Sequence, residues 1–151
     1  MEAFGEVSFV EAIGGSLQDW AAKMQRDSLV LYVDCCNSHD PYRLYKVSGS
    51  EDSQNRVLVA RPFTLNQLRE LVLNKLETMV QSTGARVVMV SGVGYYSPDN
   101  SSDRGEWSAI WSEVYARLRA LSKDYGLLTL VSDGSEDTTG LDDGVKIMLA
   151  H

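Results

Sequence analysis

Apolar residues occur in short runs that are separated by polar, glycine-containing segments. Runs of about four to eight apolar residues without helical spacing are typical of strands, so the sequence predicts six of them. The runs SLVLYVD and RVLVA are almost continuously apolar, which is typical of strands that are covered on both faces in a parallel sheet. The predicted strands are residues 3–10, 28–34, 56–60, 86–93, 127–132 and 145–150.

Helical spacing of apolar residues appears between these runs. The capping box that begins at Thr64 is followed by leucines and valines at helical spacing as far as Gly84, which predicts one continuous helix. A second stripe, which includes Trp107 and Trp111, predicts a helix over about 106–125 with its aromatic residues in the core. Shorter helices are predicted at residues 17–26 and, starting at Pro41, at residues 41–46.

Two polar segments are predicted to be loops. These are residues 48–55, where no packed structure is expected, and residues 94–105. Alternation of strands and helices predicts an α/β fold with a mostly parallel central sheet and helices on both faces. A chain of 151 residues is long enough for one domain, and we expect a single domain over residues 1–151.

Composition and charge exclude several classes of protein. The chain has 14 Lys and Arg against 21 Asp and Glu, a net charge of −7, which argues against attachment to nucleic acid through bulk charge. No apolar run approaches the roughly 20 residues that cross a bilayer, so no membrane is expected. Cys35 and Cys36 are adjacent and cannot form a disulfide framework. We expect a cytoplasmic protein, or a nuclear one in a eukaryote.

Three segments carry motifs of one family, in the family's order. VLYVDCCNSHDPYRL (30–44) resembles a strand that ends in Asp-Thr-Glu and continues through Phe-x-Pro-Glu-Arg-Leu. RVLVARPFTLNQL (56–68) resembles a strand that ends in Val-Ala-Arg-Ala-Phe. RVVMVSGVGYYSPDNSSDRGEW (86–107) resembles a Walker B strand and a DNA-binding loop with Gly-Arg-Gly-Glu-Leu. Together they resemble the RecA/RadA recombinases, which implies a RecA-like P-loop NTPase fold over nearly the whole chain.

The groups that ATP hydrolysis needs in this family are replaced in this chain. A P-loop binds phosphates through backbone N–H groups and a lysine, in the pattern G-x-x-x-x-G-K-[ST]. The matching stretch, residues 9–16, has Phe9 at the first glycine and Gly15 at the lysine. Cys36 takes the place of the catalytic Glu, and Ser91 that of the Walker B Asp. The implied degenerate nucleotide site is Gly14, Gly15, Ser16, Cys36 and Ser91, with Asp133 at the phosphate-sensing position.

The resemblance and these losses together imply an ATPase-dead RecA-like domain. We therefore expect no catalytic residue, no cofactor and no metal ion, and a protein that is not an enzyme. The alternative is an ordinary α/β protein that has been misaligned with the family.

Binding of DNA is a separate question. In the family an Arg between glycines contacts the nucleic-acid backbone, and Arg104 and Gly105 match that position. The alternative is a solvated loop with an ordinary arginine. Residues 133–144 take the place of the second DNA-binding loop and are acidic, so they would repel phosphate. We expect weak direct binding of nucleic acid or none.

Two further patterns have alternative interpretations. Phe9 and Ala12 match the Phe-x-x-Ala form by which recombinases add a subunit to a neighbour's sheet edge, but they lie on the first predicted strand and are better explained as core. Cys36 with His39 and Asp40 could form a nucleophile and base, or with Cys35 a zinc site. Their close spacing instead favours cysteines at the end of a buried strand.

The expected function follows from the resemblance. A RecA fold without its ATPase keeps the surfaces that pack against other RecA-like subunits. We expect an accessory module of homologous recombination and DNA repair that binds a RecA/RadA-type recombinase or a second copy of itself. The alternatives are a regulatory domain that binds a nucleotide or small ligand at Gly14, Gly15 and Ser16, and a hydrolase that uses Cys36.

Overall fold

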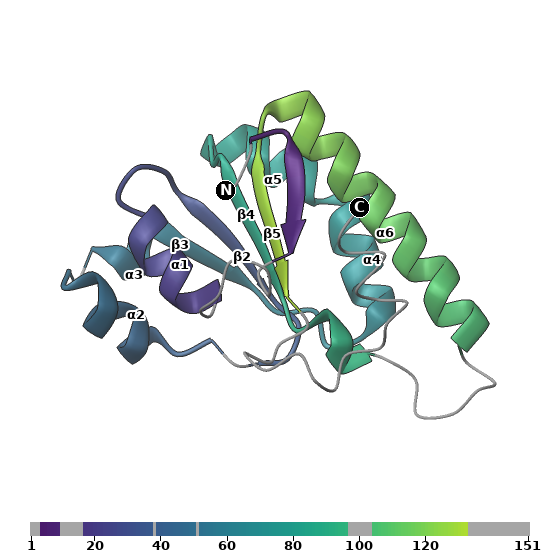
Figure 1. Ribbon diagram of the computed structural model, residues 1–151, viewed down its shortest axis with the longest axis horizontal. Helices are drawn as coiled ribbons and strands as arrows, with labels where there is room; N and C mark the ends of the chain where they lie inside the picture. Colours follow the sequence, from purple (N-terminus) through teal and green to yellow (C-terminus); the bar gives the residue numbers. More distant parts are fainter. Residues whose placement is uncertain (1–3, 10–16, 38, 51, 97–103, 133–151) are drawn as a thin grey trace.

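The computed structural model describes residues 4–9, 17–37, 39–50, 52–96 and 104–132 (Figure 1). The predicted strand at 145–150, the glycines at 14 and 15, Ser16 and Asp133 lie outside these residues. The strands are β1 (Glu6–Phe9), β2 (Val30–Asp34), β3 (Val57–Ala60), β4 (Val87–Ser91) and β5 (Leu128–Ser132). The helices are α1 (Leu17–Met24), α2 (Pro41–Ser48), α3 (Ser53–Arg56), α4 (Leu65–Asn74), α5 (Leu76–Thr83), the 3₁₀ helix η2 (Val93–Tyr96) and α6 (Arg104–Tyr125).

The described strands form one sheet in the order β1-β5-β4-β2-β3, and every neighbouring pair is parallel. This confirms the predicted α/β class. The order differs from the two common doubly wound orders, 3-2-1-4-5-6 and 2-1-3-4-5. Because all the strands are parallel, their carboxyl ends lie at one edge of the sheet, where Asp34 of β2 pairs with Ser91 of β4.

Helices cover both faces of the sheet, as predicted (Figure 1). One face packs against α4, α5 and α6 through a core that includes Leu31, Leu68 and Trp111. The other face packs against α1 and α2 through a smaller core that includes Ala21, Tyr32 and Leu44. Trp111 is almost fully buried, so the prediction that the stripe of α6 belongs to the core is confirmed for it.

Burial differs sharply between the strands. Every residue of β2 and β4 is buried, as their continuous apolar runs predict. The prediction that the run at 56–60 is covered on both faces is wrong, because β3 is an edge strand in which Leu58 and Val59 are each 37% exposed. The sequence could not distinguish an edge strand from a central one, because both runs are equally apolar.

The helix predicted from Thr64 to Gly84 is in fact two helices. The Thr64 hydroxyl accepts a hydrogen bond from the Gln67 N–H at 3.1 Å, which confirms the cap. Gly84 closes the second helix in the left-handed conformation, with φ of 71°. Between them, Lys75 leaves the helical conformation with φ of −124° and separates α4 from α5.

The segment expected to lack packed structure also differs from its prediction. It contains most of α3, and both Ser48 and Ser53 are buried. The Ser53 hydroxyl donates to the Ser50 carbonyl at 2.7 Å, and Ser48 makes similar local hydrogen bonds. Serine hydroxyls that satisfy nearby backbone groups allow a polar segment to pack.

Candidate functional site

The carboxyl ends of β2 and β4 lie side by side at one edge of the sheet. The chain leaves β2 through α2 toward β3 on one face, and leaves β4 through α6 toward β5 on the other face. Connections that diverge in this way mark a topological switch point, where open α/β sheets bind their ligands. The candidate site therefore centres on Asp34 and Ser91, the last residues of these two strands.

Asp34 is the buried centre of this site, with 1% of its surface exposed. Its Oδ2 accepts a hydrogen bond from the His39 backbone N–H at 2.9 Å and lies 3.6 Å from Nε of Arg61. Its Oδ1 lies 3.9 Å from Sγ of Cys36. A buried charge needs such partners to offset its lost hydration. Asp34 thus holds together the loop after β2 and the residue that follows β3.

His39 lies over the aromatic ring of Tyr32, with ring centroids 5.2 Å apart and planes tilted by 47°. Burial lowers the pKa of His39 and Arg61 adds to this effect, while Asp34 and Asp40 oppose it. The imidazole is therefore neutral at pH 7, and its buried Nδ1 has no hydrogen-bond partner among the described residues. Burial also raises the pKa of Tyr32, whose hydroxyl is hydrogen-bonded to Ser91.

The two cysteines differ in their surroundings. Burial raises the pKa of Cys35 to about 12, so it is a neutral thiol and a poor nucleophile at pH 7. Cys36 is half-buried and packs closely against Gly92, where an added Cβ would lie 2.6 Å from Sγ. Gly92 also has φ of +89°, so this position favours glycine for two reasons.

Tyr96, the last residue of η2, lies beside Cys35 at the border of the site. Its hydroxyl donates a hydrogen bond to the Pro62 carbonyl and contacts the Cys35 thiol. Burial raises the pKa of Tyr96, so the phenol is protonated. Tyr96 therefore links η2, which follows β4, to the residues that follow β3.

The structure places only some of the predicted site residues close together. Cys36 and Ser91 come together, since the Cys35 N–H donates to the Ser91 carbonyl at 2.8 Å and Cys36 contacts Gly92. Gly14, Gly15, Ser16 and Asp133 lie outside the described residues. Arg104 and Gly105 were expected in a loop, but α6 already begins at Arg104.

The ion pair of Arg61 and Asp34 and the contact of His39 with Tyr32 were not predicted from the sequence. A signal was present, because Asp34 and Arg61 each follow an apolar run, and parallel strands place such residues at one edge. In the described part of the chain, no three His, Cys, Asp or Glu side chains are close enough to hold a metal ion.

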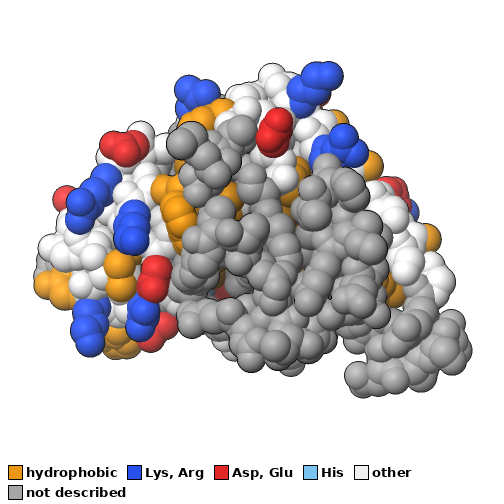
Figure 2. All heavy atoms as spheres, viewed as in Figure 1, with side chains coloured by type: hydrophobic (Ala, Val, Ile, Leu, Met, Phe, Trp, Pro, Cys, Tyr) orange, Lys and Arg blue, Asp and Glu red, His pale blue; other side chains and the backbone are white. Residues whose placement is uncertain are grey.

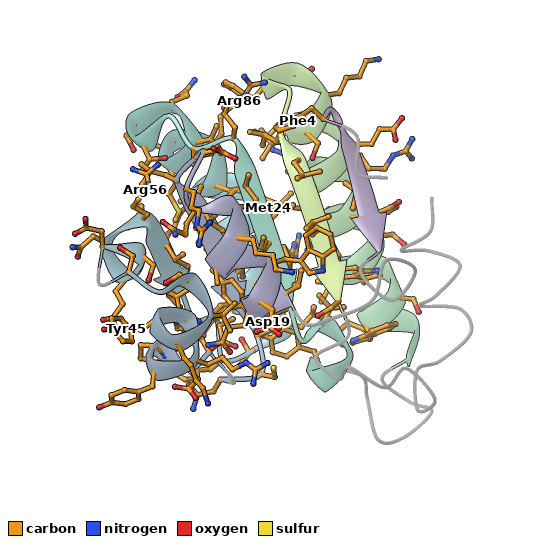
Figure 3. All side chains as sticks on the ribbon, turned by 60° about the vertical axis from the view of Figure 1, so that its left-hand side comes forward. Phe4, Asp19, Met24, Tyr45, Arg56 and Arg86 are labelled. Carbon is orange, nitrogen blue, oxygen red and sulfur yellow. The ribbon has the colours of Figure 1, made fainter. Side chains whose placement is uncertain are left out.

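A second region of interest lies along the outer edge of β3. Apolar side chains are exposed there and on the neighbouring α2, and Figure 2 shows apolar and charged side chains mixed over this end of the molecule. We call them the β3-edge surface. Figure 3 places Tyr45, one of its members, on the outer side of α2. The members of the β3-edge surface are Tyr42, Tyr45, Leu58, Val59 and Phe63.

A hollow of about 360 Å³ adjoins this surface between the end of β3 and α4. Arg61, Glu70 and Lys75 contribute charged groups to it, and Leu71 contributes an apolar wall. Such a hollow can receive a side chain of a partner that lies along the strand.

None of the described helices is long and apolar enough to cross a membrane. Searches against known protein families and against curated proteins found no match.

Proposed function

We propose that this chain is a non-catalytic RecA-like module that acts through protein–protein contacts, as an accessory of a RecA/RadA-type recombinase in homologous recombination and DNA repair. The observation that carries the proposal is the β3-edge surface. Its partner is a recombinase or a second copy of this chain.

The chemistry of the β3 edge supports a docking role. An edge strand presents unpaired backbone N–H and C=O groups to which another strand can add, and proteins usually protect such edges with charged residues. This edge instead carries Leu58 and Val59, followed by Phe63, which is 72% exposed. Leu58 and Val59 point to opposite faces of the sheet, so a strand that adds to this edge would contact apolar side chains on both faces. In the recombinases a Phe-x-x-Ala segment adds to a neighbour's sheet edge, and the hollow beside β3 suits an aromatic side chain of that kind.

The arrangement at the carboxyl edge supports the RecA-like interpretation. Cys36 and Ser91 match the catalytic Glu and the Walker B Asp of that family, and they are far apart in the sequence. Residues that serve one nucleotide site must meet in space, and these two positions lie at the ends of the paired strands β2 and β4. A thiol and a hydroxyl at these positions favour loss of catalysis, because magnesium prefers carboxylate oxygens.

The experiment compares two exposed phenylalanines at different parts of the surface. The purified chain is mixed with the recombinase of the same organism, and Kd is measured by analytical ultracentrifugation. Phe63→Asp is expected to weaken association at least tenfold. Phe4→Asp changes a residue that is 57% exposed and lies beside Arg86 at the other end of the strands (Figure 3), and it should leave Kd unchanged.

Each outcome of this experiment has a clear meaning. Absence of association with the recombinase and of self-association at micromolar concentrations would contradict the proposal. Equal losses in both variants would show that the contact does not involve the β3 edge.

A second candidate function is regulatory binding of a nucleotide or another small ligand. The observation that favours it is the position of Asp34, His39 and Arg61 at the switch point of the sheet. Titration with a fluorescent ATP analogue and magnesium tests it, with an active RecA-like ATPase as the positive control. Micromolar affinity would favour a nucleotide-dependent switch, and absence of binding would leave the protein–protein role as the better explanation.

A further inference from the structure

The edge of the sheet opposite β3 is formed by β1. This strand pairs with β5 on one side, and no described residue pairs with its other side. The Gly5 N–H donates to the carbonyl of Leu127, which precedes β5, at 2.7 Å. Successive N–H groups of a strand point to opposite edges, so those of Glu6 and Ser8 point to the open side. This side can therefore form backbone hydrogen bonds with one more strand.

A groove of about 560 Å³ lies between β1 and the second half of α6, which runs beside it (Figure 1). The residues that α6 contributes are exposed and lie three or four positions apart, so they form one stripe of the helix. The groove thus joins an open strand edge to a stripe of small and cationic side chains. Its lining residues are Gly5, Glu6, Val7, Ala116, Arg119, Ala120 and Lys123.

The two faces of β1 differ in charge. Val7 packs against the core that includes the buried side of α6, so it points to the α6 face. Glu6 pairs with Leu128, which belongs to the other core, so its carboxylate lies on the opposite face. On the α6 face the charged groups that line the groove are the cations of Arg119 and Lys123.

Neither cation has an anionic partner in the part of the chain that the structure describes. The Arg119 guanidinium lies instead over an aromatic ring, 5.9 Å from the centre of Tyr115. Hydrogen bonds between a cationic donor and a carboxylate are stronger than neutral ones. An occupant with carboxylates on the α6 face would therefore complement this groove.

We propose that the groove binds an acidic, extended segment of a partner protein, which adds to β1 as one more strand. Acidic side chains at alternate positions of the segment lie on the α6 face and meet Arg119 and Lys123. The spacing fits, because alternate residues of a strand are about 6.7 Å apart and residues four apart in a helix rise by about 6 Å. The residues between them are neutral or basic, since a carboxylate beside Glu6 would be unfavourable.

A second copy of this chain does not have this pattern. If two β1 strands paired about a two-fold axis, each face of the sheet would continue as the same face in the other copy. The partner copy's carboxylate at position 6 would then lie on the face of Glu6, where two like charges would meet. Arg119 and Lys123 would gain no anion from β1 of that copy. Charge therefore favours a different protein as the occupant.

This inference rests on β1 and α6, so it can hold even if the proposed function fails. If both hold, the chain has a contact site at each edge of its sheet.

Binding of two peptides of equal composition to the full chain tests the proposal. In the peptide TEVEVEVT the glutamates share one face of a strand, whereas TVVEEEVT places glutamates on both faces. Both carry fluorescein, and fluorescence anisotropy at low salt measures Kd. The Kd of TEVEVEVT should be at least tenfold lower. Equal Kd values, or no binding of TEVEVEVT at millimolar concentration, would overturn the proposal.

Charge reversal tests the contribution of α6. Lys123→Glu should raise the Kd of TEVEVEVT at least fivefold. Lys46→Glu is the matched control, because Lys46 is also exposed and also lies in the last turn of its helix, α2. This variant should leave Kd unchanged. Equal losses in the two variants would show that only the overall charge attracts the peptide, which would overturn the proposal.

Hydrogen exchange distinguishes an added strand from a loose electrostatic contact. Saturating TEVEVEVT should slow exchange of the Glu6 and Ser8 amides at least fivefold, and amide-resolved NMR measures this change. Unchanged exchange at these two amides would overturn the proposal. A dimer of the chain alone that Lys123→Glu dissociates in analytical ultracentrifugation would also overturn it, in favour of a second copy in the groove.

Discussion

The carboxyl end of β2 and the outer edge of β3 are neighbours in one sheet, but they are built in opposite ways. At the end of β2, Asp34 is 1% exposed and each of its oxygens has a partner. Along β3, Leu58 and Val59 have more than a third of their surface exposed. Substitutions at the first region should therefore change the stability of the fold, while those at the second should change what the fold binds.

The largest effect is expected at Gly92. A Cβ there would lie 2.6 Å from the Cys36 Sγ and 2.9 Å from its backbone nitrogen, and φ of +89° is unfavourable for any L side chain. Strain and overlap together predict that Gly92→Ala lowers the free energy of unfolding by about 3–4 kcal/mol. Urea denaturation measures this change.

Gly105→Ala is the matched control. Nothing lies within 4 Å of a Cβ at Gly105, which is in the first turn of α6. Alanine in a helix is favoured over glycine by about 0.5–1 kcal/mol, so this variant should be as stable as the parent or slightly more stable. Losses of similar size in both variants would contradict the close packing of Cys36 on Gly92.

At the end of β2, Asp34 should show a smaller but still large effect. Asp34→Asn keeps the shape of the side chain but removes the charge that faces Arg61 and buries an amide with unpaired N–H groups. Because Arg61 is half-exposed and can be hydrated, we expect a loss of about 2 kcal/mol in urea denaturation rather than the larger cost of a fully buried pair.

Asp19→Asn tests whether the loss of stability in Asp34→Asn arises from the burial of Asp34. Asp19 forms a similar ion pair with Arg43 at 2.8 Å, but on the surface. Exposed pairs contribute at most about 1 kcal/mol, so this variant should lose less than Asp34→Asn. An equal loss in the two variants would remove the distinction between the buried site and the surface.

The features that depend on the local pattern of apolar and polar residues could be predicted from the sequence. It identified β2 and β4 as buried strands, and the Thr64 cap was correct. It could not predict that β3 is an edge strand or that Arg61 reaches Asp34, because both depend on strand order. The break at Lys75 was also missed, because the apolar spacing continues across it.

A smaller effect should appear in the pH dependence of stability. Burial lowers the pKa of His39 in the folded state, so the unfolded chain binds a proton at this residue first as the pH falls. Stability should therefore decrease as the pH drops through about 6.5, the ordinary pKa of histidine. Thermal unfolding at pH 7.5 and 5.5 measures the decrease, which His39→Asn should reduce. An unchanged pH dependence in His39→Asn would contradict a half-buried, neutral imidazole.

The smallest effect on stability is expected at Leu58. Leu58 pairs in register with Leu31 of β2, which is fully buried, so one substitution can be compared at two adjacent positions of the sheet. Leu31→Ala should cost about 3 kcal/mol, as is usual for a core leucine, whereas Leu58→Ala should cost less than about 1 kcal/mol. Urea denaturation measures both. If Leu58→Ala costs as much as Leu31→Ala, the β3 edge is covered in solution, and its leucine serves the fold rather than a partner.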